Sequence, residues 1–347
     1  MGYLLFMNEK KRSNGNKEND ALVENEKINY KNLIKRYPWI VQENQKCIVS
    51  PDSDGLLCGL FMSYYFNWKI IGYYDGKILC IKKDESVKDA VFLDMDIFRN
   101  YVKSLGHHMV LYNKKHKPKN WFNFDNCIQP NNIRDYDVKT KFNLKYPLGA
   151  IHLILGIASQ VKEIEIKDSA ICPLLYTDGT FKNLFNYPEN CLNWLNFLCA
   201  EDKNNPLNKV FFNSRYTTSS LMFALKDFFE RLNKIKDGKR GGDKIKISNS
   251  SGTPVNFLKR NENTFDIEEK QKERTKTFLN ILADLTGWEF LEEYWTFDNL
   301  RIYKFKKGSI KPSEKRYNEL IEKNPLSLAI TSRSAVEFTL EEPDKLP

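Results

Sequence analysis

Short apolar runs separated by polar turns organise the first half of the chain. Residues 46–50 (KCIVS) form such a run, ended by Pro51, which is typical of a buried strand in a parallel sheet. Residues 56–65 predict a helix, and residues 68–74 and 90–93 predict two further strands. This succession of strand, helix and strand favours an α/β domain with a doubly wound, mostly parallel sheet.

Polar stretches divide the chain into three predicted parts. Residues 8–27 are charged and almost free of large apolar side chains, so residues 1–28 are expected to be a flexible leader. Residues 29–201 carry the apolar runs of the first domain. After the polar stretch at residues 200–209, residues 202–347 predict a smaller α+β domain for substrate binding or interaction.

The second half has its own pattern. Residues 218–233 and about 267–285 predict helices, aromatic residues predict strands through Tyr294 and at 301–305, and residues 329–340 predict a closing strand. A length of 347 residues agrees with two domains, since single cores of this size are uncommon.

Charge and cysteine usage narrow the class of protein. The net charge of +9 mildly favours polyanionic partners such as nucleic acid, although a lysine-rich surface gives the same value. The seven cysteines include no CxxC pair, which indicates buried free thiols rather than a zinc ribbon. With no apolar run long enough for a membrane helix and no secretory signal pattern, we expect a cytoplasmic protein without a membrane partner.

Acidic residues follow two of the predicted strands. Asp52 and Asp54, in SPDSDG, come directly after the first strand, and Asp94 and Asp96, in FLDMD, follow another. Ligand sites of parallel α/β sheets lie at the carboxyl ends of strands, so these carboxylates are expected to converge. Their mutual repulsion is costly unless a cation intervenes. Oxygen ligands together with imidazole suit Mn²⁺ or Mg²⁺.

Two of the four histidines, His107 and His108, are adjacent and lie close to Asp94 in the sequence. Adjacent histidines that open a strand face opposite sides, so one is expected beside Asp94 and the other on a phosphate or a carboxylate. Asp178 follows a further apolar run and precedes Gly179. Taken singly, such motifs are more often turns or helix caps; the four in order indicate a metal site.

This order of motifs resembles the DHH phosphoesterase superfamily, which includes single-strand exonucleases, oligonucleotide phosphodiesterases and manganese-dependent inorganic pyrophosphatases. Its first motif, a strand followed by Asp-x-Asp, is similar to residues 52–54, and its second, a strand-terminal Asp, to Asp94. Its Asp-His-His motif is similar in part to residues 106–108, and its Asp-Thr-Gly-like turn to residues 178–180. The resemblance covers roughly residues 46–200.

The resemblance implies a catalytic site with one or two Mn²⁺ (or Mg²⁺) ions, at which an activated water attacks phosphorus in line. One ion would be held by Asp54, Asp94, His107 and Asp178, the other more weakly by Asp52 and Asp94, and His108 would contact the phosphate.

Two features depart from the family pattern. Residues 48–51 contain none of the ligands that usually precede the first Asp, and Gly106 stands where the family has Asp. His107 also follows Asp94 by only 13 positions, which leaves no room for the usual strand before the histidines.

These departures leave the second metal site open. Three alternatives follow: the second site is lost, the substrate completes it, or Asp96, His116 or His152 supplies the missing ligand. His152 also has an ordinary role as a core residue of an apolar helix, and His116 an ordinary role on the surface.

Three functions follow. The first is a divalent-metal-dependent phosphodiesterase, a nuclease acting on single-stranded or short nucleic acid. The second is a catalytically degenerate DHH-like subunit that binds nucleic acid or serves as a scaffold. The third is a haloacid-dehalogenase-like phosphatase with Asp94 as nucleophile and Asp96 as acid/base, which leaves Asp52 and Asp54 without a role. Protein partners and homo-oligomer formation remain open.

Substrate contacts are predicted in the basic, aromatic segment RIYKFKK. There Arg301, Lys304 and Lys306 would follow a nucleic-acid backbone while the aromatic rings stack on bases. A half-exposed strand has the same alternation, so the pattern predicts either.

Overall fold

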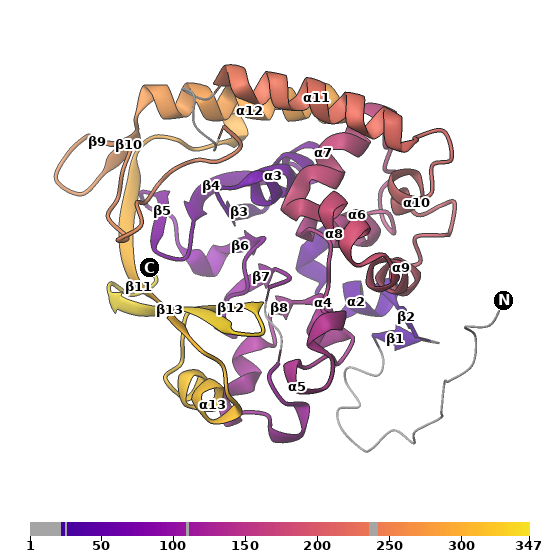
Figure 1. The fold of residues 1–347 in the computed structure, drawn as a ribbon. Helices are drawn as coiled ribbons and strands as arrows, with labels where there is room; N and C mark the ends of the chain where they lie inside the picture. Colours follow the sequence, from indigo (N-terminus) through magenta and orange to yellow (C-terminus); the bar gives the residue numbers. More distant parts are fainter. Residues whose placement is uncertain (1–21, 25, 109–110, 236–241) are drawn as a thin grey trace.

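The computed structural model describes residues 22–347 except 25, 109–110 and 236–241 (Figure 1). The described helices are α2 (Tyr30–Arg36), α3 (Ser53–Phe66), α4 (Pro130–Ile133), α5 (Val138–Lys141), α6 (Ala150–Ala158), α7 (Ile171–Tyr176), α8 (Thr180–Asn186), α9 (Pro188–Phe197), α10 (Pro206–Phe211), α11 (Thr218–Ile235), α12 (Glu269–Thr286) and α13 (Glu314–Glu322).

The described strands are β1 (Val23–Glu24), β2 (Lys27–Ile28), β3 (Lys46–Val49), β4 (Lys69–Tyr74), β5 (Ile78–Lys82), β6 (Ala90–Leu93), β7 (Lys103–Leu105), β8 (Cys127–Ile128), β9 (Phe257–Lys259), β10 (Phe265–Ile267), β11 (Leu300–Ile310), β12 (Ser327–Ser332) and β13 (Ala335–Pro343). The prediction of an α/β protein is confirmed.

One large sheet runs through most of these strands in the order β12-β13-β11-β5-β4-β3-β6-β7-β8, with β10 and β9 attached beside β11. Strands β4, β3, β6, β7 and β8 are parallel to one another. From β4 outward, through β5, β11, β13 and β12, every pairing is antiparallel. The sheet is therefore mixed, and it is parallel only in the part built by the first half of the chain.

The second half of the chain extends this sheet instead of forming a separate one. Strand β11 pairs with β5, so hydrogen bonds cross the boundary that we predicted at residues 201 and 202. The sheet also curls strongly, since Ile97, just past β6, pairs with Ser327 at the start of β12. Figure 1 shows the yellow strands β12 and β13 lying close to β6 as a result.

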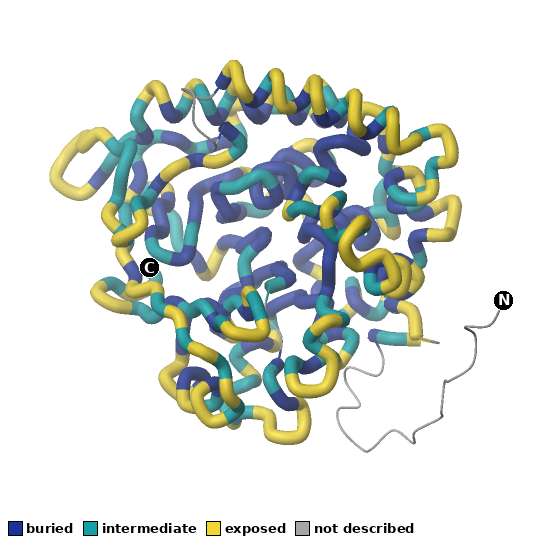
Figure 2. Tube along the Cα trace, viewed as in Figure 1, coloured by how far each residue is buried: buried dark blue, intermediate teal, exposed yellow. Residues whose placement is uncertain are grey.

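Successive side chains along the parallel strands point to opposite faces of the sheet. Val49 and Leu93 point into a large core with helices α3, α6, α7 and α12, whereas their neighbours Ile48 and Phe92 point into a second core with residues of β5 and β11. All four side chains are fully buried, which explains why these strands read as continuous apolar runs. Figure 2 shows the buried strands enclosed by helices whose outer sides are exposed.

Three other predictions concern the amino-terminal segment, the cysteines and membrane helices. Residues 1–21 of the predicted leader lie outside the described residues, while its last part forms the β1–β2 hairpin, in which Leu22 and Ile28 are buried. All seven cysteines are free and six of them are buried, as expected. Within the described residues, no helix combines the length and the apolar character needed to cross a membrane.

Candidate metal centre

The carboxyl ends of three neighbouring parallel strands bring the predicted motifs together. Strand β6 lies between β3 and β7. Asp52 and Asp54 follow β3, Asp94 follows β6, and the pair His107-His108 follows β7 after a single glycine. The convergence expected from parallel topology is therefore present.

The strand before the histidines is very short. We predicted that no strand would fit between Asp94 and His107, and this was wrong, because the three residues of β7 pair in parallel with β6. A strand of three residues is enough to bring the histidine pair to the same edge of the sheet as Asp94.

The fourth motif reaches the cluster from the helical layer. Asp178 lies in a tight turn between α7 and α8, and its φ is 51°. Asp94 has a φ of 61°. Asp is among the few residues that tolerate this left-handed region. The backbone therefore takes a sparsely populated conformation at two of the carboxylates that meet here, as often happens at functional sites.

The imidazole of His107 lies at the centre of the cluster. Its Nε2 atom is 2.8 Å from Asp178 Oδ2, 3.3 Å from Asp94 Oδ1 and 3.6 Å from Asp54 Oδ2. One ligand atom from each of these four residues lies within 4.8 Å of the other three. Asp54 and Asp94 are buried, while the Asp178 side chain is 25% exposed and faces solvent.

The donor set fits a divalent cation. Asp94 Oδ1 and His107 Nε2 are buried and have no hydrogen-bond partner among the described residues, although the two atoms are close to each other. Ligands at about 2.1 Å from an ion lie at most about 4.2 Å apart, a separation that these four side chains reach with small movements. Three carboxylates and one imidazole can therefore hold a metal ion.

Burial and mutual repulsion disturb the protonation of the cluster. Burial, reinforced by the charge of Asp178, raises the pKa of Asp54 to about 7. Burial and the carboxylates of Asp54 and Asp52 raise the pKa of Asp94 well above its usual range. For His107, the charges of Asp178 and Asp94 outweigh burial and raise the pKa. A divalent cation would relieve the repulsion that causes these shifts.

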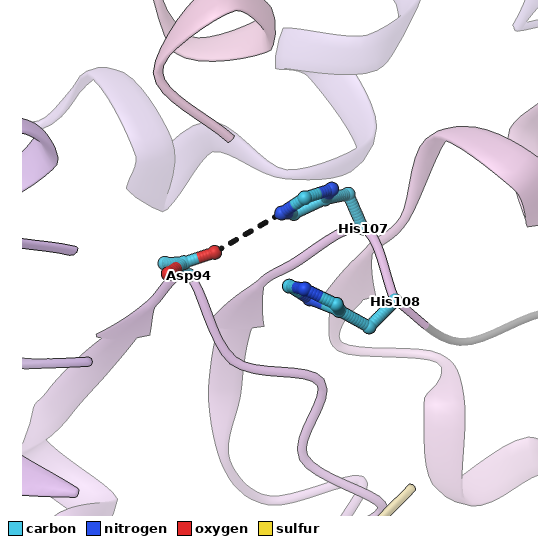
Figure 3. Close-up of side chains that lie close together, drawn as sticks. All are labelled: Asp94, His107 and His108. Carbon is cyan, nitrogen blue, oxygen red and sulfur yellow. Dashed lines mark ion pairs between the residues drawn. The ribbon is translucent and has the colours of Figure 1, made fainter. Parts of the chain in front are cut away.

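His108 also joins the cluster, contrary to our prediction that only one histidine would lie beside Asp94. Figure 3 shows both rings pointing toward Asp94, and their centroids are 4.0 Å apart. The pair lies beyond the end of β7, so strand alternation does not apply to it. Burial and the charge of His107 lower the pKa of His108 to about 3, so His108 is a neutral imidazole that can bind a metal.

Asp54 is held in place by the start of helix α6. The backbone N–H of Ala150 donates to Asp54 Oδ2 at 2.5 Å and that of Ile151 donates to Asp54 Oδ1 at 3.2 Å. This approach requires glycine at position 149, where a Cβ would lie 2.9 Å from Asp54 Oδ2 and 2.8 Å from Thr177 Cγ2. The helix amides thus fix the orientation of one candidate ligand.

Asp52 lies at the edge of the cluster. Its side chain caps α3 by accepting from the N–H of Gly55 at 3.3 Å, and it is in neither group of converging ligand atoms. Burial and the charge of Asp178 raise its pKa, which the ammonium group of Lys244 opposes. The structure places Asp52 beside the site, in the helix-capping role that its motif most often has.

Asp96 occupies the space beside Gly106. Its Oδ2 accepts from the backbone N–H of His108 at 2.9 Å, and its Oδ1 would lie 2.6 Å from a Cβ at position 106. Glycine is required at this close approach, and a carboxylate from the neighbouring strand end lies where a side chain at position 106 would project. Asp96 therefore supports the backbone of the histidine pair.

Replacing Gly106 with Asp is expected to destabilise the protein by about 1–3 kcal/mol, because the new Cβ collides with the Asp96 carboxylate and with the backbone carbon of Met95. Urea unfolding of Gly106→Asp, Asp96→Ala and the double variant measures this. The double variant is expected to lose less stability than the two single variants added together, since Asp96→Ala removes the carboxylate from the collision and leaves only that with Met95. Strictly additive losses would contradict the proposed proximity of residues 96 and 106.

The other predicted residues lie elsewhere. His116 pairs with Glu314 on the surface, and His152 is a buried residue of α6 whose Nδ1 accepts from the N–H of Gly149. Three predicted substrate contacts lie on β11 and do not line the cleft beside the cluster: Arg301, Lys304 and Lys306. Lys306 lines a second cavity of about 290 Å³.

A cleft of about 1010 Å³ opens beside the cluster, and Asp52, Asp94, Asp96 and His108 form part of its lining. Sequence reasoning missed the basic residues on its wall: Lys244, Lys246 and Arg274. The alternation of lysine and isoleucine in DKIKI was the available signal, because it places the lysines on one side of an extended segment.

Comparison of the chain with family models, with curated proteins and with solved structures finds no match. The function is therefore argued from the site.

Proposed function

We propose that this protein is a divalent-metal-dependent phosphodiesterase that hydrolyses single-stranded or short nucleic acid. The observation that carries this proposal is the convergence of Asp54, Asp94, His107 and Asp178 at the edge of a cleft that also has basic residues on its wall. Oxygen-rich ligand sets with one imidazole favour Mn²⁺ or Mg²⁺.

A divalent ion at these residues would polarise the phosphodiester and activate a water for attack on phosphorus. The residues themselves orient and protect the site. Asp54 is held by the amides of α6, His107 is enclosed by three carboxylates, and Asp178 faces solvent where a substrate can approach. His108, neutral and on the cleft wall, would contact the phosphate.

We further propose that residues 46–200 are a divergent DHH-like domain. Support comes from the order of the four motifs and from their meeting at the carboxyl ends of β3, β6 and β7. In this proposal Asp96, lying against Gly106, supports the histidine backbone that the missing motif aspartate would otherwise adjoin.

Hydrolysis of end-labelled single-stranded DNA and RNA tests the function. Cleavage is expected with Mn²⁺ or Mg²⁺, and none with EDTA. Asp178→Ala removes a carboxylate from the cluster, so we expect a loss of at least about a hundredfold in rate. The control Asp168→Ala removes an exposed aspartate whose ion pair with Lys209 lies outside the cluster, and it should retain full activity. Cleavage that persists in EDTA would refute the proposal.

A degenerate binding subunit is the second candidate function. It is favoured by Asp54, whose two oxygens already accept hydrogen bonds from α6 and so need not bind a metal. The same assay separates the two candidate functions, because a degenerate subunit would bind oligonucleotides but would not cleave them in the presence of any metal ion.

A further inference from the structure

The basic strand β11 has a partner on only one side in its carboxyl half. On one edge, β11 pairs with β5 only as far as Lys304, after which the N–H of Phe305 donates to the carbonyl of Lys77 at 2.7 Å. From Lys306 to Ile310, β11 pairs with β13 on its other edge. Within the described part of the chain, no strand pairs with these residues on the edge beyond the end of β5, which is called the open edge below.

The pairing register shows which backbone groups point to the open edge. The carbonyl of Thr339 accepts from the N–H of Leu326 at 2.7 Å, so the backbone of Thr339 faces β12. Lys307 lies opposite Thr339, so its backbone also points away from β13, and the same holds for Ser309, two residues further on. Both residues are exposed. The open edge therefore offers N–H donors and C=O acceptors at the spacing of a β-strand.

A groove of about 290 Å³ lies beside this edge, between β11, β13 and helix α13. Its floor is apolar, with Ile310, Leu320 and Leu340 around the half-buried ring of Phe338. The ring lies across Gly308, where a Cβ would be only 2.5 Å from its Cζ atom. The groove therefore suits a large apolar side chain.

The rim of this groove is positively charged. It carries three cations, Lys306, Arg316 and Lys323. Arg316 and Lys323 make no ion pair with a carboxylate of a described residue, and Lys306 lies 3.8 Å from the exposed Glu342. The carboxylate that belongs to the lining, Glu319, lies 4.0 Å from Lys315. Positive charge around the groove favours an acidic partner.

We infer that this surface binds an acidic peptide segment of a partner protein, which adds to the open edge of β11 as a further strand. An apolar side chain of the peptide fills the groove. Acidic residues two positions before and after it pair with the rim, because alternate side chains of a strand lie on one face. The groove lies on the α13 face of the β12–β13 hairpin and contains no residue of the acid cluster, so this docking does not depend on the proposed function.

Two other occupants match the surface less well. Nucleic acid would be attracted by the rim, but its phosphates carry no donors for the carbonyls of Lys307 and Ser309. A second copy of the chain, paired edge to edge, would bring the lysines of β11 against each other.

Synthetic peptides test the inference by fluorescence anisotropy with the full chain. The probe is a labelled peptide with a central leucine, a glutamate two positions before and after it, and threonine elsewhere. Lysine in place of both glutamates should abolish detectable binding, and serine in place of leucine should weaken binding about tenfold. Failure of the acidic peptide to bind wild type at low salt would overturn the inference.

Backbone methylation of the probe tests strand addition. Alternate N–H groups of a strand point to opposite sides, so methylating the set that faces β11 should weaken binding at least about tenfold, and methylating the other set should not. Equal effects of the two sets would contradict strand addition.

A proline at the open edge tests the same point from the protein. The N–H of Ser309 takes no part in the ladder with β13, so Ser309→Pro should keep the fold and bind the peptide at least about tenfold more weakly. Ser309→Thr keeps the N–H and should bind as wild type does. Thermal unfolding followed by circular dichroism checks that both variants are folded. Wild-type affinity in a folded Ser309→Pro variant would refute the proposed mode of docking.

The rim is tested by a matched pair of charge variants. Arg316→Ala/Lys323→Ala should weaken peptide binding at least about fivefold. The control Lys311→Ala/Lys315→Ala removes the same charge from exposed lysines that do not line the groove, and its affinity should be that of wild type. Equal losses in both variants would show that only net charge matters and would overturn the inference.

Competition separates a peptide from a nucleic acid. A ten-residue oligo-dT should not displace the bound peptide at concentrations similar to that of the unlabelled peptide. If it displaced the peptide equally well, and if its own binding were lost in Arg316→Ala/Lys323→Ala, the surface would be a nucleic-acid site and the inference would be wrong.

Discussion

The variant Asp94→Asn is expected to abolish the stabilisation of the protein by Mn²⁺ or Mg²⁺ and to lower oligonucleotide hydrolysis at least about a hundredfold. Asp94 is the buried carboxylate common to both groups of converging ligand atoms. In wild type, an ion at a hundred times its dissociation constant adds about 2.7 kcal/mol, which corresponds to about 4 °C in Tm for a chain of this size.

Without metal, the same substitution is not expected to lower the Tm of the protein. Asn fits the left-handed backbone at position 94 and has nearly the same shape, but it carries no charge. Since the repulsion from Asp54 and Asp52 disappears, the Tm of metal-free Asp94→Asn should be no lower than that of metal-free wild type. A purely structural role for Asp94 predicts the reverse, a lower Tm with and without metal.

Asp89 provides the matched control. It is an exposed residue immediately before β6, whereas Asp94 immediately follows the same strand. Asp89→Asn should keep both the metal-induced shift in Tm and the activity. Differential scanning fluorimetry with EDTA and with each metal makes the comparison. A metal shift of wild-type size in Asp94→Asn would exclude the cluster as the metal site.

The variant Gly149→Ala is expected to damage stability and metal binding together. Its Cβ would meet Thr177 at 2.8 Å and Asp54 at 2.9 Å, so either helix α6 or the Asp54 carboxylate must move. Overpacking of this kind costs about 1–3 kcal/mol, and it displaces Asp54 from the amides that orient it. Metal titrations should show weaker affinity by about tenfold or more, as is typical when a ligand is no longer held by its orienting hydrogen bonds.

A variant at the other end of the same helix separates the two effects. Ala158→Gly lowers the stability of α6 by about 1 kcal/mol through helix propensity, without touching Asp54. It should therefore have a lower Tm than wild type and an unchanged metal-induced shift. If Ala158→Gly lost the metal response as Gly149→Ala does, general loosening of α6 would explain both results.

The amino-acid sequence by itself determined the parallel centre of the fold. Strands β3, β4 and β6 agree closely with the predicted runs, because strands buried on both faces are apolar throughout. Helices α3, α11 and α12 also match their predicted segments. The convergence of the first three motifs could be predicted from the sequence because parallel topology sends the carboxyl ends of neighbouring strands to one edge.

The local pattern of apolar and polar residues did not predict elements that are short or that are stabilised by residues far away in the sequence. Strand β7 has three residues, too few for any periodicity, and exists because β6 and β8 pair with it. The predicted closing strand at residues 329–340 is a hairpin of β12 and β13, and the segment at Tyr294 is a single helical turn. Such elements depend on neighbours that a local window does not contain.

Only the tertiary structure decided the composition of the site. It brought Asp178 from the helical layer to His107, turned both histidines toward Asp94, and left Asp52 as a helix cap. It also placed Lys244 and Arg274, residues of the second half of the chain, on the wall of the same cleft. The sequence singles out the candidate ligands, but their distances come from long-range pairing, because β11, β12 and β13 close the curled sheet around the ends of the parallel strands.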